Sequence, residues 1–165
     1  MSVQWLENRV RGSASWPKEV TMVNFGGHEL FLLPATKDTE KSVYMKLRNI
    51  SIADAMTLIN RFLSVLSWCA DQPMENLGGG ASSGVPAFAR RCPMASGPSI
   101  SFPFGRKLES GTKARRALAL FREARTVNSN AFEFLGYFKI LNIFWKDKYD
   151  SKKTGLRVRE WVIFT

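Results

Sequence analysis

The sequence predicts an α+β fold in which a small antiparallel β-meander packs beside a bundle of three main helices. Two observations lead to this prediction. Short β-prone runs separated by turn residues fill positions 1–48, and longer runs with helical periodicity follow between positions 49 and 146. Because the chain has 165 residues, of which 45% are hydrophobic, it is large enough to bury a core as one domain.

The β-meander is predicted from three runs in the first third of the chain. Val20–Phe25 and Glu29–Leu33 flank the pair Gly26-Gly27, and two glycines supply the positive φ angles that a tight hairpin turn requires. Ser42–Leu47 alternates well enough to form a third strand. Val3–Val10 carries a weaker pattern that is compatible with a short strand or a helical turn. We therefore expect a sheet with one face free to cover helices.

The first helix is predicted over Ser51–Ala70. Ser51 is a suitable N-cap with Asp54 three residues later, and Arg61 falls on the face expected to meet solvent. The predicted buried face consists of Ile52, Ala55, Met56, Ile59, Phe62, Leu63 and Leu66. The next stretch, 71–98, is rich in glycine, serine and proline and is predicted to be a loop. It lacks the lysine of a P-loop, so a phosphate cradle of that kind is not expected.

Two further helices are predicted within Thr112–Lys146, separated by the polar turn Thr126–Asn130. Asn130 followed by Glu133 resembles a capping box that opens the second of them. This second helix is apolar around most of its circumference, and Phe138 lies in its middle. Because such a helix is usually covered on several sides, we expect it to anchor the core.

The stretch ALALFREARTVNSNAFEFLGYFKILNIFWK resembles the signature of the MauJ-like, methylamine-utilisation-associated family and, more distantly, the opening helix pair of HEPN domains. The similarity covers about Ile50–Lys146 and includes Arg122, Glu123 and Lys139. It implies a helical core and an accessory or maturation role, or an enzyme, in amine metabolism. Many HEPN ribonucleases carry an arginine followed four to six residues later by a histidine. The sole histidine here, His28, has no arginine at that distance before it, so the resemblance does not imply nuclease activity.

The positive charge is concentrated in the second part of the chain. Residues 1–104 hold ten Lys/Arg and eight Asp/Glu, whereas residues 105–165 hold fourteen and six, out of a net charge of +10. Such asymmetry indicates an anionic partner, such as nucleic acid or an acidic protein, although it can also serve solubility alone. The predicted anion-binding or nucleic-acid-binding residues are Arg115, Arg116, Arg122, Lys146, Lys148, Lys152 and Lys153.

The residue types that enzymes and metal sites require are scarce. His28 is the only histidine, and the two cysteines, Cys69 and Cys92, form neither a disulfide framework nor a zinc motif. We therefore predict no catalytic, cofactor-binding or metal-binding residues. The cysteine usage and the lack of an apolar N-terminal segment favour a cytoplasmic protein without a membrane partner.

The expected organisation is a single domain over residues 1–165. Positions 1–48 form its mainly β part, 49–146 its helical core with loop 71–98, and 147–165 a basic C-terminal tail. The function expected first is a non-enzymatic binding or accessory protein that contacts RNA or another acidic partner. Two alternatives stay open: a role in amine metabolism, which the resemblance implies, and a structural subunit of a homodimer.

Overall fold

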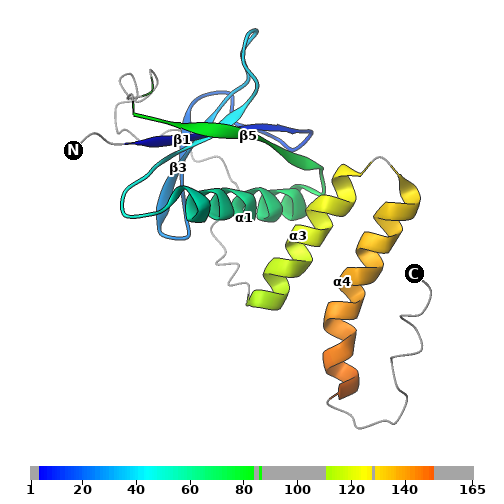
Figure 1. The fold of residues 1–165 in the computed structure, drawn as a ribbon. Coiled ribbons are helices and arrows are strands. Elements are labelled where there is room, and N and C mark those ends of the chain that lie inside the picture. The colour runs from blue at the N-terminus through cyan, green and yellow to red at the C-terminus, as the bar shows by residue number, and fades with distance from the viewer. Residues whose placement is uncertain (1–3, 84–85, 87–110, 128, 151–165) are drawn as a thin grey trace.

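The computed structural model describes residues 4–83, 86, 111–127 and 129–150, and at 144 and 146–150 it describes only the backbone. The elements follow in this order: β1 Trp5–Gly12, β2 Thr21–Phe25, β3 His28–Leu33, β4 Ser42–Lys46, α1 Ile52–Ala70, β5 Met74–Ser82, α3 Thr112–Thr126 and α4 Asn130–Asp150. Together the sheet and the three helices confirm the predicted α+β class (Figure 1).

The five strands form one antiparallel sheet in the order β2-β3-β4-β1-β5. The predicted hairpin is confirmed: Phe25 pairs with His28, and between them Gly26 and Gly27 have φ angles of 59° and 81°. A Cβ atom disfavours both angles, which is why two glycines occupy this turn. The β2-β3-β4 part is thus the predicted meander, and the ambiguous N-terminal run is a strand that lies between β4 and β5.

The prediction of a loop over residues 71–98 is wrong for Met74–Ser82, which is the edge strand β5. Its glycines, which favoured the loop, permit close strand pairing instead. A Cβ added at Gly79 would collide with the backbone carbonyl of Glu7 on β1. The pairing register also shifts between Arg9 and Val10, beside Gly78 with its φ of 83°. This combination is typical of a β-bulge. The remainder of the predicted loop, apart from residues 83 and 86, lies outside the described part of the chain.

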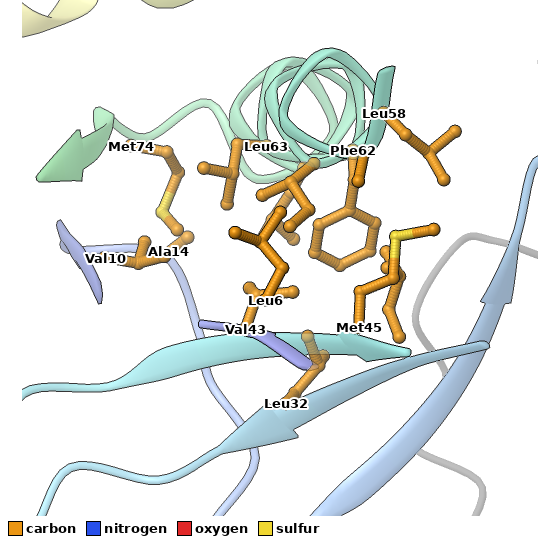
Figure 2. Packing of buried hydrophobic residues seen from close by; sticks show 14 residues of the cluster. Leu6, Val10, Ala14, Leu32, Val43, Met45, Leu58, Phe62, Leu63 and Met74 are labelled. Carbon is orange, nitrogen blue, oxygen red and sulfur yellow. The ribbon is translucent and has the colours of Figure 1, made fainter. Parts of the chain in front are cut away.

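The core lies between one face of the sheet and α1 (Figure 2). The helix begins as predicted, because Ser51 Oγ accepts a hydrogen bond from the Asp54 amide at 3.1 Å. Phe62 is fully buried and meets Phe25 edge to face, with ring centroids 5.5 Å apart. The other buried members of the cluster are Leu6, Val10, Ala14, Leu30, Leu32, Val43, Met45, Ala55, Leu58, Ile59, Leu63, Leu66 and Met74. Of the predicted buried face of α1, Ile52 is instead exposed at the first turn.

The expectation that the most apolar helix anchors the core is wrong. That helix is α4, which packs on α3 at the outside of the molecule (Figure 1), and Phe138 in its middle is 39% exposed. Although α4 is strongly apolar, the face of the sheet that forms the core is covered by α1. The three helices therefore form successive layers: α1 on the sheet, α3 on α1, and α4 on α3.

Candidate anion-binding site

The candidate site depends on how α3 packs against α1. The buried residues of α3, Ala117, Phe121 and Ala124, follow one another at the helical spacing of a single stripe. Phe121 meets Trp68, near the end of α1, edge to face with centroids 4.9 Å apart. These contacts fix one end of α3 on α1 and place the arginines of its first turns and its middle beside α1.

A cavity of about 330 Å³ lies between α1, α3 and the end of β2. Its lining consists of Phe25, Thr57, Asn60, Arg61, Ser64, Val65, Arg115, Leu118, Ala119 and Arg122. Three arginines are in this set and no aspartate or glutamate is. The hydroxyl groups of Thr57 and Ser64 donate to backbone carbonyls of their own helix, at 2.9 and 2.8 Å. The charged donors that line the cavity are therefore the guanidinium groups.

Arg122 is the most fixed of the three arginines. Its Nη1 donates to the carbonyl oxygen of Asn60 at 3.3 Å and to Asn60 Oδ1 at 3.1 Å. Asn60 Oδ1 also accepts from Asn76 Nδ2 of β5 at 3.0 Å, so one small network joins α3, α1 and β5. Burial lowers the pKa of Arg122, and the neighbouring carboxylate of Glu123 acts in the opposite direction. Its hydrogen-bond partners within the cavity are the neutral amide oxygens of Asn60, which carry no opposite charge.

Arg61 and Arg115 face the same cavity from opposite helices. Burial lowers the pKa of the Arg61 guanidinium, and the positive charge of Arg115 lowers it further. The two positive charges repel each other. An anion bound between them would attract both guanidinium groups and offset this repulsion. Guanidinium groups also suit phosphate and carboxylate oxygens geometrically, because each presents several donors in one plane.

The structure brings together two of the predicted binding residues and separates a third. Arg115 and Arg122 share one face of α3, as their spacing of seven residues predicts, whereas Arg116 is exposed and does not line the cavity. Lys146 and Lys148 belong to α4 where only the backbone is described, and Lys152 and Lys153 lie outside the described residues. Sequence reasoning missed Arg61, which it assigned to the solvent face of α1.

Other kinds of site are not found in the part of the chain that the structure covers. No three His, Cys, Asp or Glu side chains gather there in a way that could hold a metal ion. His28 opens β3 at the hairpin turn and is not among the residues that line the cavity. None of the described helices is long and apolar enough to cross a bilayer.

Comparison with known proteins adds no further constraint on the site. No protein-family model, no curated protein and no solved structure matches the chain. The resemblance to MauJ-like and HEPN proteins therefore stays a prediction, as does the role in amine metabolism that it implies.

Proposed function

We propose that the protein is a binding or accessory protein that holds phosphate groups of a nucleic acid, RNA first among them, at the cavity between α1 and α3. The observation that carries this proposal is the set of three arginines, Arg61, Arg115 and Arg122, in a cavity whose described lining residues include no carboxylate. Lysine and arginine contacts to phosphates supply most of the sequence-independent affinity for nucleic acids. The net charge of +10 adds long-range attraction for the same partner.

The three arginines have different roles in this proposal. Arg122 positions α3 through its bonds to Asn60, so its replacement would disturb the site as well as remove a charge. Arg61 and Arg115 supply charge with less structural involvement, and they are the better choice for a binding test. Arg116 is a matched control for Arg115, because it is the next residue of the same exposed helical turn and carries the same charge outside the cavity.

The test is a titration of fluorescently labelled single-stranded RNA and duplex DNA, followed by anisotropy at about 50 and 200 mM salt. We expect the logarithm of the affinity to fall linearly with the logarithm of the salt concentration. Arg115→Gln should weaken binding by about tenfold at low salt and reduce the salt slope by about one, as expected for one lost phosphate contact. Arg61→Gln should have a similar effect, and Arg116→Gln a clearly smaller one.

Three results would overturn the proposal in different ways. Absence of binding to both oligonucleotides at low salt would exclude a nucleic-acid function. Equal losses in Arg115→Gln and Arg116→Gln would mean that binding is spread over the basic surface and that the cavity has no special part. Binding of a polyglutamate peptide but not of oligonucleotides would assign the cavity to an acidic protein partner.

A further inference from the structure

The α4 helix packs on α3 along a side that includes Glu133, Gly136 and Tyr137. A Cβ atom added at Gly136 would lie 2.5 Å from Ala124 Cβ, so the two helices approach most closely at this glycine. Beside it, Arg125 Nη1 donates to Glu133 Oε1 at 3.0 Å, and Tyr137 Oη donates to the same oxygen at 2.7 Å. The predicted capping role of Glu133 is thus replaced by a contact between helices. Several large apolar residues of α4 therefore lie on the side of the helix that faces away from α3.

This outward side is a large exposed apolar face. Phe134 and Leu141 are 67% and 62% exposed, and the rings of Phe134 and Phe138 stack with centroids 6.4 Å apart. The exposed large hydrophobic residues of α4 are Phe132, Phe134, Leu135, Phe138, Leu141 and Trp145. Their exposed parts amount to roughly 500 Å², taking about 200 Å² for a whole aromatic side chain. This much exposed apolar surface on one helix is uncommon unless the surface meets a partner.

The spacing of four of these residues indicates what kind of surface fits against them. Phe134, Phe138, Leu141 and Trp145 follow one another at intervals of four, three and four residues. These are the a and d positions of a heptad pattern, whose side chains pack between those of another α-helix. We refer to these four residues as the α4 seam. The one charged residue between its ends, Lys139, lies off the seam, so the seam offers no charge for an ionic partner.

The spacing of the four seam residues is the same in both directions along the helix, so the seam is complementary to a second, antiparallel copy of itself. Four, three and four reads the same in both directions, so two antiparallel copies bring all four positions into register. Phe134 then lies opposite Trp145 of the partner subunit, and Phe138 lies opposite Leu141 of the partner subunit. Self-complementarity of this kind is what a two-fold symmetric interface requires. The internal segment outside the described residues, 87–110, is a poorer occupant because its three prolines are incompatible with a continuous helix.

We propose that the α4 seam binds the α4 seam of a second copy of the chain, with the two helices antiparallel around a two-fold axis. The two faces together bury on the order of 1,000 Å², which is near the lower limit for a specific interface. Because an interface of this size leaves little free energy beyond the cost of association, we expect a reversible dimer with a Kd on the order of 10 μM. This inference is independent of anion binding, because the cavity and the seam involve different residues.

The experiment is sedimentation velocity of the full chain from about 1 to 100 μM. Wild-type protein should shift from monomer to dimer over this range, whereas Leu141→Glu and Phe134→Ser should stay monomeric at every concentration. Ile52→Glu is the matched control, because Ile52 is an apolar residue on α1 that is also half exposed, and this variant should dimerise like the wild type. Far-UV circular dichroism establishes that each variant retains its helices.

Two outcomes would overturn the proposal. If the wild-type chain is monomeric at all concentrations, another surface or another part of the chain covers the seam. Flotation with anionic phospholipid vesicles then separates the remaining occupants, since a monomer that binds vesicles through the seam assigns it to a membrane surface. If dimers persist in both seam variants but are lost in Ile52→Glu, the interface lies elsewhere on the protein.

Discussion

Replacing a single phenylalanine in α1 and in α4 distinguishes the observed core from the one that hydrophobic pattern alone predicts. Phe62 in α1 is 0% exposed and packs on Phe25. Phe62→Ala removes a whole ring from a packed interior and should reduce the free energy of unfolding by about 3–5 kcal/mol. Since 1 kcal/mol corresponds to about 2–4 °C in a chain of this size, the Tm should fall by roughly 10 °C.

The same substitution in α4 should have a much smaller effect. Phe138 is 39% exposed, and the ring stacked on it, that of Phe134, is itself mostly exposed. Phe138→Ala therefore loses only part of the burial of one side chain and leaves no enclosed cavity, so its cost in the monomer should be about 1 kcal/mol. An α4 that anchored the core would instead make the two substitutions equally damaging.

The assay is urea unfolding followed by circular dichroism at a protein concentration of about 1 μM, where the proposed dimer is largely dissociated. Phe62→Leu serves as a control that retains most of the volume and should lie between wild type and Phe62→Ala. If Phe138→Ala costs as much as Phe62→Ala under these conditions, the layered arrangement of the helices is wrong. At about 100 μM, the cost of Phe138→Ala should increase, because the wild type then gains stability from association.

Three further predictions concern the α3–α4 contact and the hairpin. Gly136→Ala should reduce the free energy of unfolding by about 1–2 kcal/mol, since the new methyl group collides with Ala124; a more stable variant in urea unfolding would show that the helices are not so close. Hydrogen bonds from Tyr137 and Arg125 lower the pKa of the Glu133 carboxyl below its ordinary value of 4.5. The stabilisation that Glu133 provides is therefore present above pH 4.5 and is lost as the pH falls through its lower folded-state pKa. In acid titrations of the urea midpoint, Glu133→Gln should weaken that dependence, and an unchanged profile would argue against the contact. His28→Ala should leave the thermal midpoint and any RNA cleavage unchanged, and a cleavage activity that disappears in this variant would contradict the non-catalytic interpretation.

The parts of the fold that the sequence predicted correctly are those set by local signals. The turn Gly26-Gly27 has positive φ angles that glycine favours, and β-prone runs lie on either side of it. Ser51 caps α1 through an atom three residues away. None of these features depends on residues far away in the sequence, so the local sequence was sufficient to predict each of them.

Strand β5 could not be predicted because its partner determines it. A run with Gly78, Gly79 and Gly80 has low β-propensity and locally favours a loop. It becomes a strand because β1 has no other partner on that side, and because the backbone of Glu7 approaches closer than a Cβ atom at Gly79 would allow. Glycine in this strand reflects close packing of two backbones.

The position of α4 was misjudged because hydrophobicity does not reveal which side of a helix meets its neighbour. Two of the few residues of α4 that are not large and apolar, Glu133 and Gly136, face α3, whereas Phe134 and Phe138 are exposed. A small residue and a bonded carboxylate allow close packing of two helices, whereas three phenylalanines, Phe132, Phe134 and Phe138, remain exposed. The same apolar pattern is therefore compatible with a helix of the core and with a helix of an interface, and the exposure of its side chains distinguishes the two.

The candidate site was predictable only in part, for a related reason. Arg115 and Arg122 share a face of one helix, which their spacing shows, but their proximity to Arg61 depends on the packing of α3 on α1. That packing uses Phe121 and Trp68, neither of which signals a binding site. A charged residue on an amphipathic helix becomes a candidate for ligand binding when the packing of another helix brings further charges beside it. The sequence of one helix does not show which of its charged residues these are.

The two proposed surfaces lie on opposite sides of α3, which determines how their tests bear on each other. The residues of α3 that line the cavity, Arg115, Leu118, Ala119 and Arg122, cluster on one helical face. The residues of α3 nearest Gly136, Leu120 and Ala124, lie about half a turn away, on the side that receives α4. An anion in the cavity and a second chain on the α4 seam therefore do not compete for space. We therefore expect Leu141→Glu to lose dimerisation and retain RNA binding. Arg115→Gln should lose RNA binding and retain dimerisation. This pair of results would agree with both proposals and would show that α3 separates the two functions.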